Sequence, residues 1–215
     1  MNEVARGMLI AVEGADGAGT TTQCRRLEAW LVARGRVVHL TREPSTLPVG
    51  RLIRAVLGGD PPGFDPAALA LLFAADRVDH LRREVEPAVR AGAVVLTDRY
   101  VMSSLVYQGL GVDHEFVATV NRLAPPPDLT LLVDVPAEVA AARRARRGGA
   151  PELFEADETQ RRVIERYRRE AEAAHERGER VVIVDGTPDE QTVFEALRDE
   201  VAMALDITME REERA

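Results

Sequence analysis

Residues 8–23 read MLIAVEGADGAGTTTQ, an apolar run followed by a glycine-rich turn and three threonines. The apolar run is short and continuous, which is typical of a strand covered by helices on both faces. EGADGAGTTTQ (13–23) fits a phosphate-binding loop, G-x-x-x-x-G followed by lysine and a hydroxyl residue. The lysine position holds Thr20, while Thr21 keeps the hydroxyl that ligates Mg²⁺ in such loops. The segment alone leaves two interpretations open, an anion-binding loop and a glycine turn capped by threonine.

Four further apolar runs resemble the first and alternate with helical patterns. The predicted strands span 8–13, 37–41, 94–98, 129–135 and 180–185. The predicted helical stretches span 21–35, 65–92, 112–124, 136–178 and 188–205. Strands separated by helices imply right-handed βαβ crossovers and a parallel sheet with helices on both faces. The sequence therefore predicts an α/β fold in one domain, with ligands bound beyond the carboxyl ends of the strands.

Local signals mark some of the helix limits. Asp65 followed by Pro66 predicts an N-cap and first turn, and Pro87 should end or kink the long helix that starts there. The only cysteine, Cys24, excludes an internal disulfide and a cysteine zinc cluster. Its apolar surroundings favour a packing role.

Composition narrows the class of protein. The 215 residues carry a net charge of −8, which argues against broad binding to nucleic acid or to an anionic membrane. No run approaches the roughly 18 apolar residues of a membrane span. The first apolar run is too short for a signal peptide. We therefore expect a soluble cytoplasmic protein.

Two of the predicted strands end in motifs with an arginine. Thr41-Arg42-Glu43-Pro44 (41–44) closes the second strand and Thr97-Asp98-Arg99-Tyr100 (97–100) closes the third. An aspartate at such a position can hold magnesium through water, and an arginine can clamp a phosphate with two hydrogen bonds. Either motif alone is more typical of a solvated salt bridge. Beside a glycine loop, the two arginines indicate a donor and an acceptor phosphate site.

In this order, the motifs resemble those of the bacterial thymidylate kinases. The matching segments are EGADGAGTTTQ, TREP (41–44), LLFAADR (71–77), DRYVMSSLVYQG (98–109), PDLTLLVDVPAEVAAAR (127–143) and VVIVDGT (181–187). The resemblance implies a three-layer P-loop NTPase fold, a single kinase domain over 1–215 and an arginine-rich lid at about 143–157. It also implies transfer of the γ-phosphoryl group of ATP to dTMP in dTTP biosynthesis, with Mg²⁺, by a homodimer. Apolar positions such as Leu69, Leu72 and Val78 could contribute to the dimer face.

The resemblance also assigns the site residues. ATP would be bound by Gly14, Ala15, Asp16, Gly17, Ala18, Gly19, Thr20 and Thr21. The substrate dTMP would be bound by Arg42, Phe73, Arg77, Arg99, Ser104 and Tyr107. Magnesium would be held by Thr21 and Asp98, partly through water. The catalytic residues would be Asp16, Arg99, Arg143, Arg146 and Arg147.

Within the acceptor set, the resemblance gives each residue a role. Phe73 would stack on thymine, and Arg77, four residues later on the same helix face, would hydrogen-bond it. Ser104 would meet the pyrimidine edge, and Tyr107 would lie near the deoxyribose and disfavour a 2′-hydroxyl. For Phe73 or Tyr107 alone, core packing would be the better interpretation. Their combination at these spacings favours base recognition.

The lid shows the main departures from the family pattern. RRARRGG (143–149) places three arginines on one helix face, and mobile arginines suit phosphoryl transfer because this reaction needs charge neutralisation. The lid of the family usually continues with an acidic-Arg-x-Glu stretch. Here Leu153 takes the place of that arginine and only Glu155 is retained.

Three functions stay open. A kinase without the loop lysine is energetically credible, since losing one preorganised donor costs about 10²–10³ in rate while one arginine finger can supply about 10³–10⁵. A catalytically degenerate nucleotide-binding protein is the second. The third is a deoxynucleoside kinase, for which Glu43 could act as general base. The intact base-pocket and TREP motifs favour the thymidylate kinase.

Overall fold

The computed structural model describes residues 6–60, 64–148 and 153–206, apart from the side chain of Arg147. Five strands form one sheet in the order β2-β3-β1-β4-β5, and all neighbouring strands are parallel. They are β1 (Met8–Glu13), β2 (Val38–Arg42), β3 (Val94–Asp98), β4 (Leu129–Asp134) and β5 (Val181–Asp185). The predicted five-stranded parallel sheet is therefore confirmed, with strand limits shifted by a residue or so.

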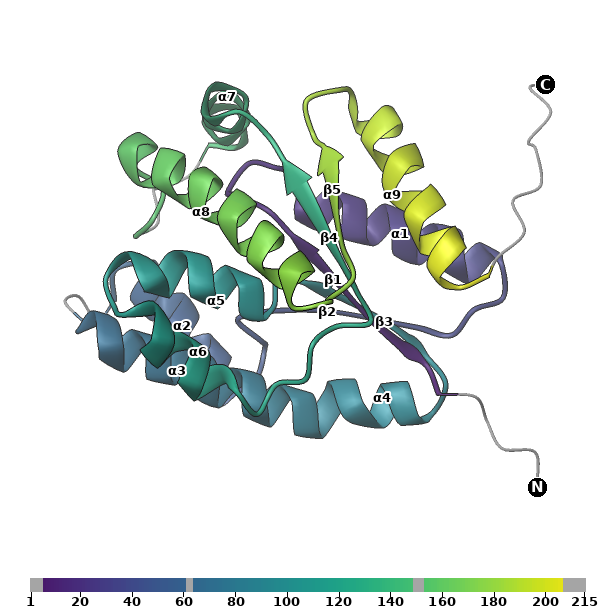
Figure 1. Ribbon diagram of the computed structural model, residues 1–215, viewed down its shortest axis with the longest axis horizontal. Coiled ribbons are helices and arrows are strands. Elements are labelled where there is room, and N and C mark those ends of the chain that lie inside the picture. The colour runs from purple at the N-terminus through teal and green to yellow at the C-terminus, as the bar shows by residue number, and fades with distance from the viewer. Residues whose placement is uncertain (1–5, 61–63, 149–152, 207–215) are drawn as a thin grey trace.

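Helices cover both faces of the sheet (Figure 1). One face carries α1 (Thr20–Ala33) and α9 (Glu190–Ala204). The rest of the helical structure consists of α2 (Pro48–Leu57), α3 (Pro66–His80), α4 (Glu86–Arg90), α5 (Val101–Tyr107), α6 (His114–Asn121), α7 (Ala137–Arg147) and α8 (Asp157–Glu176). Of these, α4 packs on β3 and α8 packs on β4 and β5, opposite α1 and α9. The result is the three-layer arrangement expected from the alternating pattern.

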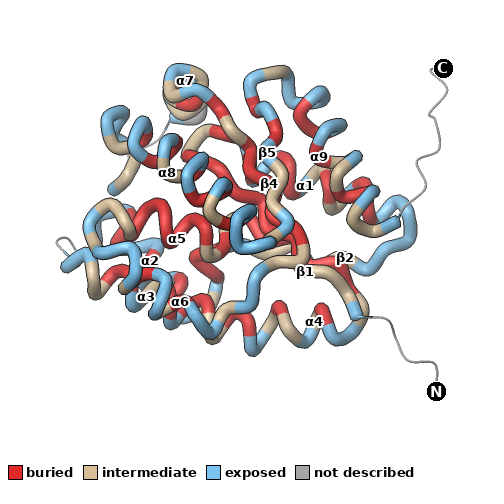
Figure 2. The backbone as a smooth tube through the Cα atoms, in the orientation of Figure 1, coloured by how far each residue is buried: buried red, intermediate tan, exposed pale blue. Residues whose placement is uncertain are grey.

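The continuous apolar character of β1 follows from this layering. Ile10 and Val12 pack in the cluster on the side of α1 and α9, whereas Leu9 and Ala11 pack with Leu81 on the other face. Because successive side chains of a strand point to opposite faces, a strand covered on both sides needs apolar residues throughout. Figure 2 shows the buried residues along the strands and on the inner sides of the helices.

The long helical prediction over 65–92 is correct in extent but not in regularity. The Asp65 carboxylate accepts hydrogen bonds from the amides of Ala67 and Ala68, so it is the N-cap of α3 as predicted. The helix then passes through a π-helical turn at Leu81–Val85 into α4. Pro87 is the second residue of α4 and directly follows the π-helical turn. The helix therefore changes to a π-helical turn before the proline and continues through it as α4.

The structure agrees with the prediction for Cys24 but not with the one for Leu69. Cys24 is buried, in keeping with a packing role, and Leu27, Trp30 and Leu31 share the buried face of α1. Leu69 is only 3% exposed and belongs to the core, so it cannot contribute to a dimer face as the sequence suggested. Within the described part of the chain, we find no helix with both the length and the apolar character needed to cross a membrane.

Candidate active site

The glycine-rich loop joins β1 to α1 at the carboxyl edge of the sheet. Gly17 and Gly19 have positive φ angles of 95° and 96°, which glycine adopts at little cost. A Cβ atom on Gly17 would lie 2.4 Å from the carbonyl oxygen of Ala140, so any side chain there would collide with α7. The loop thus leads the chain into α1, whose N-terminal amides and dipole favour an anion. This geometry fits a phosphate-binding loop better than a simple turn.

The two threonines that start α1 have different environments. Thr20, at the lysine position, is 5% exposed and begins the helix. The Thr21 hydroxyl donates a hydrogen bond to Oδ2 of Asp98 at the end of β3. Oδ1 of Asp98 is buried and has no hydrogen-bond partner among the described residues. A hydroxyl beside a carboxylate with a free oxygen is a donor set that fits Mg²⁺, because this ion prefers oxygen ligands.

Arg99 lies between the glycine loop and the helices that follow β3. Its Nη2 donates to Oδ1 of Asp16 at 2.7 Å, and its Nη1 donates to the carbonyl of Gly14 at 2.9 Å and to the hydroxyl of Tyr167 at 3.0 Å. The backbone of Arg99 has φ 76°, which is uncommon for a residue other than glycine. Strained backbone of this kind is concentrated at functional sites.

Glu13, at the end of β1, forms hydrogen bonds with residues that surround Arg99. Its carboxylate accepts hydrogen bonds from the amides of Tyr100 and Ser103 at 2.8 and 3.2 Å, and from the hydroxyls of Ser103 and Tyr167 at 2.5 and 3.2 Å. Burial raises the pKa of Glu13, and these hydrogen bonds and the charge of Arg99 oppose the rise. The sequence did not indicate Glu13, because its carboxylate acts on the start of α5, which is distant along the chain.

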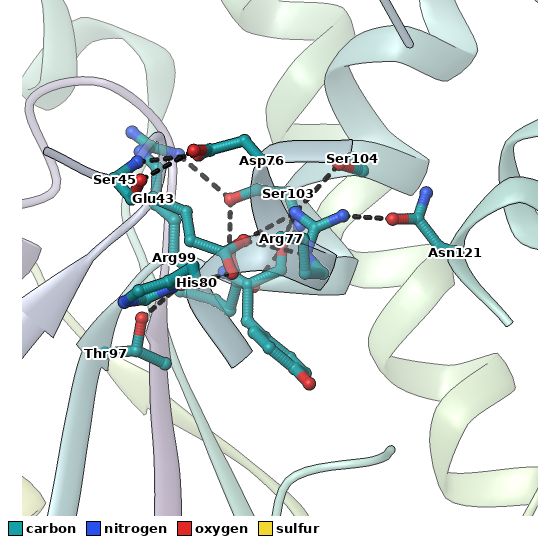
Figure 3. A network of polar contacts seen from close by, with 12 residues as sticks. Glu43, Ser45, Asp76, Arg77, His80, Thr97, Arg99, Ser103, Ser104 and Asn121 are labelled. Atoms are coloured by element: carbon teal, nitrogen blue, oxygen red, sulfur yellow. Dashed lines mark hydrogen bonds and ion pairs between the residues drawn. The ribbon is translucent and has the colours of Figure 1, made fainter. Parts of the chain in front are cut away.

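A second group of polar contacts surrounds the buried Arg77 (Figure 3). Nε donates to Oε2 of Glu43 at 2.7 Å, and Nη2 donates to the Ser104 hydroxyl at 3.0 Å and the carbonyl of Tyr100 at 3.1 Å. Nη1 donates to the side chain of Asn121. The sequence suggested Arg77 and Ser104 as separate contacts to a base, but the structure also joins them to each other. Glu43 is paired with Arg77, which leaves it poorly suited to act as a free general base.

One cavity collects most of the residues predicted for the acceptor. Its lining includes Phe73, Arg77, Arg99, Ser104 and Tyr107. Arg42 is absent from that lining. It lies at the exposed end of β2 and lines a second, larger cavity beside the glycine loop, called the donor-side cavity below. The predicted acceptor set is thus brought together apart from Arg42.

Gln108 and Phe154 are among the residues of this cavity that the sequence did not assign to the site. Gln108 is buried in the lining, and its Oε1 has no hydrogen-bond partner among the described residues. The SSLVYQG segment contained it, so the motif could have identified it. Phe154, in the segment predicted as a lid, packs edge-on against Tyr107, with ring centroids 5.5 Å apart. No local pattern marks Phe154, since it reaches the cavity only by tertiary folding.

The larger neighbouring cavity, on the donor side, is lined by the glycine loop and by two arginines of α7. All loop residues from Ala15 to Thr21 line it, together with Asp98, Arg143 and Arg146. Arg143 reaches the carbonyl oxygens of Thr187 and Pro188 at 3.4 and 3.3 Å, in the segment after β5. Arg146 lines the cavity as well, whereas the Arg147 side chain and residues 149–152 lie outside the described residues.

A donor-side cavity with a phosphate-binding loop and an adjoining acceptor pocket together define a kinase of small phosphorylated substrates. The family model for thymidylate kinase matches residues 12–197. A probable thymidylate kinase of Pyrobaculum aerophilum is 46% identical over 184 residues, covering 84% of this chain and 90% of the relative. A thymidylate kinase of Cereibacter sphaeroides is 42% identical over 197 residues, covering 86% and 91%.

The chain therefore belongs to the thymidylate kinase family, and it is an ATP-dependent nucleoside monophosphate kinase. This confirms the function expected from the sequence at the level of the family. Its relatives come from archaea as well as bacteria, so the resemblance is broader than the bacterial group suggested by the motifs.

Proposed function

We propose that this protein transfers the γ-phosphoryl group of ATP to dTMP, giving dTDP and ADP. The observation that carries the proposal is the position of Arg99. Its guanidinium contacts Gly14 and Asp16 of the donor loop and also lines the acceptor pocket. A cation at this boundary can stabilise the charge on a phosphoryl group that passes from one cavity to the other.

The donor side is built for a polyphosphate. The loop from Gly14 to Thr21 would hold the β- and γ-phosphates through backbone amides. Thr21 and Asp98 would hold Mg²⁺, partly through water, and the ion when bound would neutralise phosphate charge. Asp16, held by Arg99, would set the position of that arginine against the donor.

The acceptor pocket provides an apolar wall and polar edges for a pyrimidine nucleotide. Phe73 would stack on the base, with Arg77 and Ser104 at its polar edge. The unpartnered Oε1 of Gln108 lines the same pocket, so we add this residue to the base-recognition set. Tyr107 would pack near the sugar and disfavour a 2′-hydroxyl. Arg42, at the donor-side cavity, would contact phosphate from outside the pocket.

The missing loop lysine is the main energetic question for this reaction. Loss of one preorganised donor costs about 10²–10³ in rate, whereas a well-placed arginine can supply about 10³–10⁵. The donor-side cavity is lined by Arg99, Arg143 and Arg146. We propose that these cations, with Arg147 of the same segment, together carry the charge that the lysine would carry, with Arg143 acting on the bound ATP and the other three on the transferring group.

We propose one kinase domain over residues 1–215 with a lid at about 143–157. We also propose a cytoplasmic homodimer that acts in dTTP biosynthesis, with ATP and dTMP as its small-molecule partners and with neither nucleic acid nor membrane as a partner.

The test is ADP formation with ATP and Mg²⁺ in the presence of dTMP, dUMP, dCMP or thymidine in turn. We expect turnover with dTMP. ATP binding without turnover on any monophosphate would identify a degenerate nucleotide-binding protein and overturn the proposal. Turnover with thymidine alone would identify a deoxynucleoside kinase.

A further inference from the structure

Gln160 is a fully buried polar residue in the first turn of α8 and belongs to none of the motifs discussed so far. Its Oε1 accepts a hydrogen bond from the backbone amide of Asp16 at 3.2 Å. Its Nε2 donates to Oδ2 of the same aspartate at 2.9 Å and to the carbonyl of Phe154 at 2.8 Å. The side-chain amide thus binds both the backbone and the carboxylate of Asp16, and also the backbone of Phe154.

Only an amide side chain satisfies all three partners. The Asp16 amide needs an acceptor, while its carboxylate and the Phe154 carbonyl need donors. A glutamate would place a second carboxylate against Asp16, and an apolar residue would remove all three hydrogen bonds. The chemistry of the side chain is therefore matched to this junction.

Gln160 thus connects a glycine-loop residue that lines both cavities, Asp16, with Phe154, which lines the acceptor pocket. Asp16 binds Nη2 of Arg99 through Oδ1, so the grip on Oδ2 leaves the arginine contact intact and orients it. Phe154 covers the acceptor pocket, where its ring packs against Tyr107. The neighbouring Leu153 donates its amide to the carbonyl of Leu57 at the end of α2, which closes the segment over the pocket.

We propose that Gln160 is a positioning residue for phosphoryl transfer, which joins the lid segment over the acceptor pocket to Asp16 of the donor loop. The position of Phe154 at the acceptor pocket and the Asp16–Arg99 pair are then coupled through one side chain. Arg144 supports the same junction, since its Nη1 donates to the carbonyl of Asp16 at 2.8 Å and its Nη2 pairs with Asp157 at 2.9 Å. The inference rests on the proposed dTMP kinase activity for its kinetic consequence, but not for its consequence in binding.

The kinetic test replaces Gln160 by Met, which keeps the size and removes the hydrogen bonds. We expect kcat to fall about 100-fold, because small misplacements of catalytic groups cost this much, while the Kd for ATP alone changes less than about threefold. More ADP should form per dTDP, since a loosened cover admits water. Unchanged kcat with unchanged ADP-to-dTDP ratio would overturn the inference. Glu165→Gln, on the exposed side of α8, is the matched control and should behave like the wild type.

A double-mutant cycle asks whether Gln160 acts through Asp16. In Gln160→Glu the two carboxylates repel, whereas in the double variant with Asp16→Asn an amide and a carboxylate face each other again. We expect the double variant to have a higher kcat than Gln160→Glu alone, because residues in contact are not additive. Additive losses would contradict the role. Thermal unfolding of each variant shows whether a loss reflects unfolding, and only folded variants enter the cycle.

Binding without turnover separates this inference from the proposed function. In the wild type, a non-hydrolysable ATP analogue should tighten dTMP binding about tenfold, measured by calorimetry, if lid and loop are coupled through this junction. In Gln160→Met the tightening should largely disappear. Coupling that survives the substitution overturns the inference. If the wild type shows this coupling but no turnover, and Gln160→Met loses the coupling, the role of Gln160 in binding is supported and the proposed reaction is refuted.

Discussion

Arg99 shows at the scale of a single residue how a position indicated by a local motif receives its contact partners only from the fold. Its contacts come from Gly14 and Asp16 in the donor loop and from Tyr167 on α8. These partners are far apart in sequence and are brought together at the carboxyl edge of the sheet. Its positive φ is held by this surrounding structure, in the manner of strained residues at active sites.

Thr20 provides the most direct test of charge compensation. We expect Thr20→Lys to change kcat by less than about tenfold, because the arginines of the donor-side cavity already neutralise the transferred group. Steady-state kinetics with ATP and dTMP measure this, and Thr20→Gln controls for the added length. A gain of about 10²–10³, the usual value of one preorganised donor, would show that the loss is uncompensated.

Glu13 gives a prediction on stability. Burial raises its pKa above the ordinary 4.5. The folded protein therefore binds this proton more tightly than the unfolded chain, so the contribution of Glu13 to stability is complete below pH 4.5 and is lost as the pH rises through the folded pKa.

The variant Glu13→Gln cannot titrate, and its amide can still accept from the Tyr100 amide while donating to the Ser103 hydroxyl. We expect the wild type to lose stability relative to this variant by about 1.4 kcal/mol for each pH unit between 4.5 and the folded pKa. Urea unfolding at a series of pH values measures the difference. A difference that stays constant with pH would contradict the raised pKa.

At the scale of elements, α7 carries two arginines with different surroundings. Arg143 contacts the backbone carbonyls of the segment after β5, at one wall of the donor-side cavity. Arg146 lines the same cavity without contacts of this kind in the described structure. The first position suits binding of ATP, and the second suits contact with the transferring group.

We therefore expect Arg143→Met to raise the KM for ATP about tenfold with little effect on kcat. This pattern is expected when the lost interaction stabilises the bound substrate and the transition state equally. Arg146→Met should lower kcat by about 10²–10³ with little effect on KM. Initial rates over a matrix of ATP and dTMP concentrations distinguish them. Arg161→Met, an exposed arginine of α8, is the control. Equal effects of the first two variants on both constants would refute the division of roles.

The elements also show where sequence patterns fall short. The stretch VMSSLVY (101–107) forms α5 without a side-chain N-cap from its own segment. The carboxylate of Glu13 on β1 accepts from the amides of Tyr100 and Ser103 instead, which satisfies this helix start through a tertiary contact.

At the scale of the whole molecule, the proposed homodimer requires an exposed apolar face. Leu71 on α3 and Leu123 after α6 are 51% and 58% exposed, and α3 packs against α6. We expect the wild type to sediment as a dimer and Leu71→Glu as a monomer, because a buried unpaired charge is costly at an interface. Val32→Glu, on the exposed side of α1, should leave the dimer intact. A monomeric wild type, or dissociation by both variants, would contradict this face.

The sequence by itself determined the α/β class, the parallel sheet and the glycine loop, because these depend on local hydrophobic periodicity and on turn chemistry. With the ordered motifs it also indicated the family and most of the acceptor set. Tertiary structure alone decided that Arg42 faces the donor side and that Arg77 is held by Glu43. It also decided that Gln160 grips Asp16. Such contacts join residues that are distant along the chain, so their geometry is fixed only when the layers pack.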